Sequence, residues 1–268
     1  MAYITVQDLQ RLQQRGEKIT VLTAYDASFT WHLEQAGVEV ILVGDSLGMV
    51  IQGHDSTLPV TMDDMVYHTA AVARQRQRAL LIADLPYHSY LDKASALTNA
   101  RRLVDEGGAD MVKFEGGGEL IAIAAHLVEN GIPVCGHLGL LPQSVEELGG
   151  YRVQGREQAA AEAMIADAAG LKQAGVDMIV LECIPQQLAK RLGDEVDVIT
   201  IGIGAGRDCS GQVLVLYDLL GITPGKRPRF SRNFLPGQQG DNPITEAIRS
   251  YVQDVKSGAF PDEAHSFN

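Results

Sequence analysis

The sequence predicts an α/β fold, a single (β/α)8 TIM barrel spanning residues 1–268, and three observations support this prediction. Short apolar runs typical of buried parallel strands alternate with helical segments seven or eight times. The length of 268 residues suits one such barrel, and no change in composition marks a linker between domains. A GxGxxG fingerprint does not follow the first expected strand, which disfavours an open dinucleotide-binding sheet.

The expected strands are short, apolar and rich in β-branched residues. We expect them at residues 19–24, 39–43, 79–83, 109–114, 133–136, 177–181 and 196–201. Residues 212–217 (QVLVLY) form either an eighth strand or a short helix that follows the glycine-rich residues 202–206. The sequence therefore leaves the eighth repeat of the barrel open.

The expected helices begin and end at residues typical of helix caps. Asp26 and Thr61 stand at N-cap positions, and Gly37 is placed to end the second helix. The helices cover residues 5–15, 27–36, 62–75, 94–106, 119–129, 157–174, 185–192 and 245–256, the first being a short N-terminal helix ahead of the barrel. The remaining long segments are two expected loops and a less regular C-terminal segment, at residues 48–59, 139–156 and 224–243.

The composition excludes several classes of function. The net charge of −12 argues against non-specific nucleic-acid binding, which needs a positive surface. No apolar run approaches the ~18–20 residues of a membrane span, and no signal peptide is visible at the N-terminus. The widely spaced Cys135, Cys183 and Cys209 lack metal-ligand spacing and indicate a reducing compartment. We therefore expect a cytoplasmic protein without a membrane or nucleic-acid partner.

Polar side chains, most of them acidic, stand where five of the expected strands stop. They are Asp45 with Ser46, Asp84, Glu115, His137 and Glu182. The C-terminal ends of barrel strands meet at one mouth, so these side chains are expected to converge. Like charges in a low-dielectric pocket raise one another's pKa, and a divalent cation relieves that repulsion. Carboxylate ligands without a cysteine cluster favour Mg²⁺ over Zn²⁺.

Lys113 lies inside the apolar strand 109–114 and points the same way as Glu115, because side chains alternate along a strand. A lysine there needs an anionic partner, either a neighbouring carboxylate or a substrate anion.

Each of the strand-end residues also has a structural alternative. An acid after a strand, such as Glu182, can serve the first turn of the next helix. His137 lies between glycines and is either a structural or a catalytic histidine. Ser46 has no adjacent histidine in the sequence, which favours a hydroxyl ligand or an anion contact over a nucleophile.

Long motifs at these positions occur in the same order as in one known enzyme family. They are residues 43–49 (VGDSLGM), 52–61 (QGHDSTLPVT), 83–86 (ADLP), 112–117 (VKFEGG), 134–140 (VCGHLGL), 142–144 (PQS), 149–155 (GGYRVQG), 181–185 (LECIP) and 201–206 (IGIGAG). Together they span most of the chain from Thr23 to about Phe234. On these motifs the chain resembles the ketopantoate hydroxymethyltransferase family.

The resemblance implies a barrel of the phosphoenolpyruvate/pyruvate-binding type and a reaction of pantothenate biosynthesis. In that reaction 5,10-methylenetetrahydrofolate, as co-substrate, gives a hydroxymethyl group to the 2-oxo acid 3-methyl-2-oxobutanoate through a Mg-stabilised enolate. The products are 2-dehydropantoate and tetrahydrofolate. The family is also decameric, as two stacked pentamers, so the resemblance implies a homo-oligomer.

The resemblance also implies a role for each strand-end residue. The residues that attend Mg²⁺ are Asp45, Asp84 and Glu115, the first two either directly or through water. The residues that contact the keto acid are Asp45, Ser46, Asp84, Lys113 and His137, of which His137 has the least specific assignment. Glu182 is implied to be the general base that removes a proton from the carbon beside the ketone.

Two other functions remain open from the sequence. One is a Mg²⁺-dependent lyase or mutase of the same barrel superfamily, which would act on another 2-oxo acid through the same kind of enolate. A requirement for folate distinguishes it from the transferase. The other is a catalytically inactive barrel that binds a keto acid or serves as an assembly scaffold. It would be expected to lack some of the strand-end carboxylates, and none is missing here.

Overall fold

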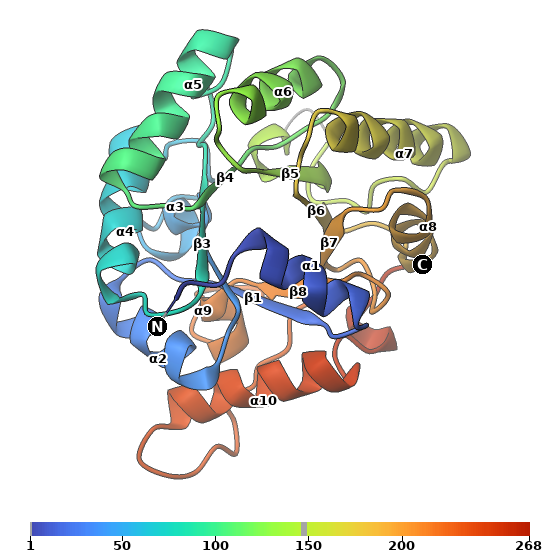
Figure 1. Cartoon of the computed structure of the whole chain (residues 1–268). Coiled ribbons are helices and arrows are strands. Elements are labelled where there is room, and N and C mark those ends of the chain that lie inside the picture. The colour runs from blue at the N-terminus through green and yellow to red at the C-terminus, as the bar shows by residue number, and fades with distance from the viewer. Residues whose placement is uncertain (1, 146–148) are drawn as a thin grey trace.

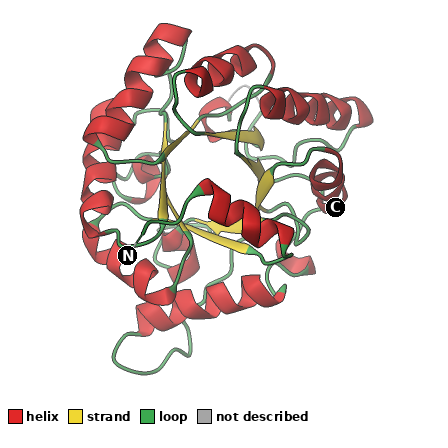
Figure 2. Cartoon of the chain, in the orientation of Figure 1, coloured by secondary structure: helices red, strands yellow, loops and turns green. Residues whose placement is uncertain are grey.

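The chain forms a closed barrel of eight parallel strands that are neighbours in chain order from β1 to β8 (Figure 1). The computed structural model describes residues 2–145 and 149–268. Figure 2 shows the ring of strands with helices around its outside. The (β/α)8 barrel predicted from the sequence is therefore confirmed.

The strands follow the apolar runs of the sequence closely. They are β1 (Ile19–Thr23), β2 (Val40–Val43), β3 (Leu80–Asp84), β4 (Met111–Lys113), β5 (Val134–Gly139), β6 (Met178–Glu182), β7 (Ile199–Ile203) and β8 (Gly211–Leu214). Pairing of β1 with β8 closes the ring, with Val21 level with Val213. Elsewhere in the barrel, Asp84 of β3 pairs with Lys113 of β4. Both residues therefore lie at the same end of the barrel.

The helices lie in the connections between strands and at the two ends of the chain. They are α1 (Val6–Gln14), α2 (Ala27–Ala36), α3 (Leu47–Val50), α4 (Met62–Gln75), α5 (Lys93–Arg101), α6 (Ile121–Glu129), α7 (Gln158–Gln173), α8 (Gln186–Glu195), α9 (Leu216–Leu220) and α10 (Pro243–Ser257). Short turns of 3₁₀ or π geometry are η1 (Arg102–Glu106), η2 (Gly118–Leu120), η3 (Pro142–Ser144) and η4 (Glu263–His265). Within residues 2–145 and 149–268, every helix is too short or too polar to cross a lipid bilayer.

The predicted helix caps are confirmed. The Asp26 carboxylate accepts a hydrogen bond from the Phe29 backbone N–H at 2.9 Å, and Thr61 forms a capping box with Asp64. Gly37 ends α2 in the left-handed conformation, with φ of 82°. These caps fix where α2 and α4 begin and therefore where the preceding loops must end.

Several boundaries differ from the sequence prediction, each for a local reason. The helix expected at 94–106 is α5 followed by the wider π-turn η1. β5 continues to Gly139 instead of stopping at Gly136, because its ladder with β6 extends as far as Glu182. Residues 212–217 were expected to form either a strand or a helix, and they contribute to both. The strand β8 ends at Leu214, and the helix α9 begins at Leu216.

The two expected long loops also differ from the prediction. The loop expected at 48–59 begins with the helical turn α3, in which the Ser46 carbonyl accepts from the Val50 N–H at 3.0 Å. The turn η3 lies in the loop expected at 139–156, and residues 146–148 of that loop are outside the described residues.

Two apolar layers hold the barrel together. Alternate strand residues such as Ile41 and Val43 point outward and pack against the helices. The intervening residues point inward and fill the barrel, as Val40 and Leu42 do. Figure 1 shows α1 lying across one end of the ring, where its fully buried Leu9 joins the inner layer. This end of the barrel interior is closed by packing, and functional sites of this fold gather at the other end.

The seam between the first and last strands is reinforced by the C-terminal helix. Tyr251 of α10 is fully buried, and its hydroxyl donates to the carbonyl oxygens of Val21 in β1 and Gln212 in β8, at 3.1 and 2.8 Å. One side chain therefore ties together the two strands whose pairing closes the barrel.

We expect Tyr251→Phe to lower the free energy of unfolding by about 1 kcal/mol, because it removes a buried hydroxyl and leaves two buried carbonyls with one donor fewer. Urea unfolding followed by circular dichroism measures this loss. Tyr67→Phe is the matched control, since Tyr67 is 67 % exposed and its hydroxyl forms no hydrogen bond within the described residues. Equal stabilities of the two variants would contradict the role of Tyr251.

Candidate active site

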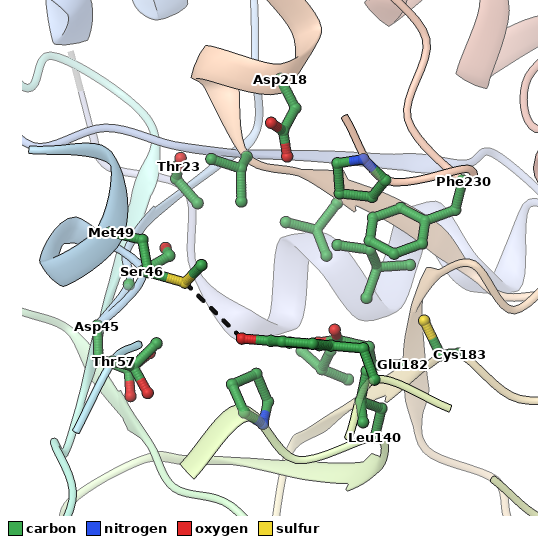
Figure 3. Close-up of a pocket in the computed structure, with 18 of the residues that line it drawn as sticks. Thr23, Asp45, Ser46, Met49, Thr57, Leu140, Glu182, Cys183, Asp218 and Phe230 are labelled. Atoms are coloured by element: carbon green, nitrogen blue, oxygen red, sulfur yellow. Dashed lines mark hydrogen bonds between the residues drawn. The ribbon is translucent and has the colours of Figure 1, made fainter. Parts of the chain in front are cut away.

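A cavity of about 580 Å³ opens at the C-terminal ends of the strands (Figure 3). It lies at the end of the barrel opposite α1, where functional side chains gather in this fold. Every site residue expected from the sequence lines it: Asp45, Ser46, Asp84, Lys113, Glu115, His137 and Glu182. The structure thus brings together residues from five consecutive strands, β2 to β6.

Lys113 and Asp84 form a buried ion pair at the ends of β4 and β3. The Lys113 Nζ lies 2.6 Å from Asp84 Oδ1, and both residues are almost fully buried. Burial alone would lower the pKa of Lys113, but Asp84, Glu115 and Asp45 together raise it. Lys113 is therefore a fixed positive charge among carboxylates, and its anionic partner is a neighbouring carboxylate.

Asp45 is the carboxylate in the least favourable electrostatic position. Its backbone N–H donates to Asp84 Oδ2 at 3.1 Å, which places the two acids side by side. Burial raises the pKa of Asp45, and the nearby charges of Asp84 and Glu115 raise it further. An additional positive charge near Asp45 would relieve this repulsion.

His137 lies between two carboxylates. Its Nδ1 is 3.2 Å from Glu115 Oε1, and its Nε2 is 3.2 Å from Glu182 Oε2. These are ion-pair distances without the alignment of a hydrogen bond. Burial acts to lower the pKa of His137, but Glu115 and Glu182 outweigh it and raise that pKa to about 9. The imidazolium form of His137 therefore holds both carboxylates in place.

Ser46 is held by an aromatic hydroxyl. Its Oγ lies 2.9 Å from the hydroxyl of the buried Tyr25, and Gly44 leaves room for it, since a Cβ at Gly44 would lie 2.8 Å from the same oxygen. Within the described residues no histidine contacts Ser46, so the geometry offers no base to activate it as a nucleophile.

Gln143 is the central residue that the sequence interpretation did not select. Its side-chain amide donates to Asp45 Oδ2 at 2.7 Å and to the Leu85 carbonyl at 3.0 Å. Its backbone N–H donates to Glu115 Oε2 at 2.9 Å. A neutral glutamine in a glycine-rich loop has no charge or periodic pattern to distinguish it, so its family motif, residues 142–144, was the only available signal.

Thr57 is a second residue that the sequence interpretation missed. It lines the cavity, is 2 % exposed, and its Oγ1 has no hydrogen-bond partner in the described part of the chain. It belongs to residues 52–61, one of the motifs that carry the family resemblance, but no role was expected for it from the sequence.

The acidic end of the cavity fits a divalent cation that keeps part of its water. Among residues 2–145 and 149–268, no group of three or more His, Cys, Asp or Glu side chains is arranged to hold a metal ion. Mg²⁺, however, is usually bound by one or two carboxylates, with water and substrate oxygens as the remaining ligands. Asp45 with the adjacent Asp84 supplies such a pair, and burial together with the charges of Asp84 and Glu115 raises the pKa of Asp45, which a bound cation would oppose.

The whole chain matches one family and many of its members. The model of the ketopantoate hydroxymethyltransferase family matches residues 3–263. A protein of Alkalilimnicola ehrlichii named 3-methyl-2-oxobutanoate hydroxymethyltransferase is 56 % identical over 264 residues, which cover 98 % of this chain and 94 % of that protein. The protein of the same name from Tolumonas auensis is 54 % identical over the full length of both chains.

Solved structures of low sequence identity share the fold. A phosphonopyruvate hydrolase in complex with oxalate and Mg²⁺ has a TM-score of 0.63 at 12 % identity, over 96 % of this chain and 99 % of that one. A 2,3-dimethylmalate lyase of the PEP mutase/isocitrate lyase superfamily has a TM-score of 0.60 at 15 % identity, over 96 % and 90 %. These similarities support the barrel and its strand order.

We expect Lys113→Met to lower the free energy of unfolding by about 3–5 kcal/mol, because it leaves the buried Asp84 without its cation. Chemical denaturation in the absence of divalent metal measures this loss. Lys190→Met is the matched control: its Nζ is also 2.6 Å from an aspartate, Asp194, but both side chains are more than half exposed. A pair of this kind contributes at most about 1 kcal/mol. Similar losses in the two variants would contradict the electrostatic role of Lys113.

Proposed function

The chain belongs to the ketopantoate hydroxymethyltransferase family, and we propose that it transfers a hydroxymethyl group from 5,10-methylenetetrahydrofolate to 3-methyl-2-oxobutanoate. The products are 2-dehydropantoate and tetrahydrofolate, as in pantothenate biosynthesis. The observation that supports the proposal best is a carboxylate, Glu182, held by His137 across a cavity from Asp45 and Asp84. This arrangement supports a base on one side of the cavity and a site for a keto acid and a cation on the other.

The proposed general base is Glu182. Its side chain is 13 % exposed, and one oxygen is occupied by His137 at 3.2 Å. The other oxygen accepts no hydrogen bond within the described residues, so it is free to take a proton. A general base must lie within hydrogen-bond distance of the proton it removes. The site for that proton is the cavity that Glu182 lines.

The proposed binding site for Mg²⁺ consists of Asp45 and Asp84, with Glu115 behind them. Bound there with the carboxylate and ketone oxygens of the keto acid as further ligands, Mg²⁺ would stabilise negative charge on the ketone oxygen. Ser46 would donate a hydrogen bond to the acid. Lys113 would offset the charge that develops as the proton is lost, without leaving Asp84.

The proposed reaction joins the third carbon of the keto acid to the one-carbon unit of the folate. Glu182 takes the proton from that carbon, and the resulting carbanion equivalent forms a bond to the methylene carbon as one of its two bonds to folate nitrogen breaks. Water then replaces the second folate nitrogen on the same carbon and becomes the hydroxyl group. The two nitrogens of the departing tetrahydrofolate take up the proton held by Glu182 and one proton of the water. Apolar side chains such as Leu42, Val180 and Ile203 line the cavity and limit the access of bulk water to the reacting carbon.

The decameric assembly and the cytoplasmic location implied by the family resemblance stay predictions. Three buried free thiols, Cys135, Cys183 and Cys209, are compatible with a reducing compartment.

The transferase activity itself is tested by the release of tetrahydrofolate from 5,10-methylenetetrahydrofolate. We expect release only when 3-methyl-2-oxobutanoate and Mg²⁺ are both present. We expect excess EDTA to abolish the release, because it removes the Mg²⁺ that Asp45 and Asp84 are proposed to bind. Conversion of the keto acid without folate would favour the lyase or mutase alternative. Full activity in EDTA would contradict the metal assignment.

We expect Glu182→Gln to slow hydrogen–deuterium exchange at the third carbon of 3-methyl-2-oxobutanoate by about 10²–10⁴-fold, because an amide cannot accept the proton. Keto acid binding, measured by calorimetry with Mg²⁺, is expected to persist. Glu162→Gln is the control, since Glu162 pairs with Arg191 on the protein surface. Exchange at the wild-type rate in Glu182→Gln would rule out Glu182 as the base.

A further inference from the structure

The cavity continues beyond the proposed keto acid site. The strand-end acids occupy β2 to β6, whereas the side formed by β7, β8 and β1 is lined mainly by uncharged residues: Thr23, Ile203, Val213, Val215 and Phe230. Even if each heavy atom of the keto acid took the roughly 30 Å³ of a liquid water, the acid would fill less than half of the 580 Å³. The β7–β8–β1 side therefore has room for a second reactant.

Asp218 is a carboxylate on this side of the cavity. It belongs to α9, directly after β8, and is 5 % exposed. Figure 3 shows its carboxylate pointing into the pocket on the side opposite Leu140. The helix that carries it is fixed, since the Leu216 N–H donates to the Thr23 hydroxyl at 3.0 Å. The Asp218 carboxylate is therefore held in one place against the cavity.

Only one of the two carboxylate oxygens of Asp218 has a hydrogen-bond partner within the described residues. The Thr223 hydroxyl donates to Oδ1 at 2.7 Å, and in residues 2–145 and 149–268 no group donates to Oδ2. Burial raises the pKa of Asp218, whereas the Thr223 hydrogen bond and the nearby charge of Arg227 act to lower it, yet Arg227 forms no ion pair in that part of the chain. Nearly buried carboxylates are normally paired or hydrogen-bonded. A ligand donor at Oδ2 would complete this site.

We propose that the Asp218 carboxylate anchors the donor edge of a flat 2-amino heterocycle, which is the pterin ring of tetrahydrofolate. This inference rests on the proposed function. The 2-amino group and the adjacent ring N–H of a pterin are neighbouring donors, and a carboxylate can accept both because each oxygen has more than one acceptor site. Val215 and Phe230 offer apolar contact to the ring faces.

The rim of the cavity supports this orientation of the folate. Lys226, Arg227 and Arg229, from the irregular segment after α9, line its outer part, and none forms an ion pair with a carboxylate within the described residues. Unpaired cations at the mouth suit the glutamate carboxylates of the folate tail. With the tail outside and the pterin at Asp218, the one-carbon unit faces the keto acid.

The test compares two dissociation constants in wild type and Asp218→Asn, one for tetrahydrofolate and one for 3-methyl-2-oxobutanoate with Mg²⁺. Asparagine keeps the shape and an acceptor for Thr223 but loses the charge and one acceptor oxygen. We expect tetrahydrofolate to bind roughly 10- to 100-fold more weakly, and keto acid binding to change by less than about twofold. Asp241→Asn is the control, because it removes an exposed carboxylate from the irregular segment that follows α9.

A tetrahydrofolate analogue without the 2-amino group provides a second measurement that needs no folded variant. We expect wild type to bind it at least about tenfold more weakly than tetrahydrofolate, and Asp218→Asn to distinguish the two much less. Equal affinity of wild type for both compounds, or unchanged tetrahydrofolate binding in Asp218→Asn, would overturn the proposed role of Asp218 but not the proposed transferase function. Keto acid binding without any tetrahydrofolate binding in wild type would overturn the folate donor as well.

Discussion

The crowding of buried carboxylates at one end of the barrel is the constraint on which the rest of the site depends. Asp45, Asp84 and Glu115 lie within one hydrogen-bonded cluster, and Glu182 joins them through His137. Such a cluster is stable only if positive charge is built into it. Lys113 and protonated His137 supply that charge from inside the strands, where a lysine or histidine would otherwise be unfavourable.

The two cations divide the carboxylates between them. Lys113 is bonded to Asp84, and His137 lies between Glu115 and Glu182, so Asp45 is left with only the neutral amide of Gln143. Burial raises the pKa of Asp45, and the charges of Asp84 and Glu115 raise it further. The proposed cation site beside Asp45 would relieve this repulsion. The second carboxylate oxygen of Glu182 accepts no hydrogen bond within the described residues, which is the basis of its proposed role as the base.

Two sides of the same cavity carry side chains of different chemical character. Strands β2 to β6 end in charged residues, and the ladder register sets these residues side by side, as Asp84 and Lys113 show. The β7–β8–β1 arc is mostly uncharged at its strand ends and has the Asp218 carboxylate above it, on α9. A reaction between a small acid and a larger heterocycle needs these two environments next to each other.

The sequence by itself determined the repeating architecture and most of the charged residues of the site. Apolar runs with acids at or just beyond their ends identify β2, β3, β4 and β6, because a parallel strand is buried on both faces and is therefore apolar for most of its length. The caps at Asp26 and Thr61 were equally local and equally predictable. Residues 212–217 stayed ambiguous because a short apolar run fits either a strand or a helix.

Only the tertiary structure decided which residues touch. The link from Gln143 to Asp45 joins side chains 98 positions apart, and the contacts of His137 with Glu115 and Glu182 depend on the register of three strands. No local pattern in the chain encodes these distances, because they arise when the barrel closes. The same holds for Asp218, which lies one residue beyond the run 212–217 and received no role from the sequence. Its significance comes from being nearly buried on the wall of a cavity that other strands build.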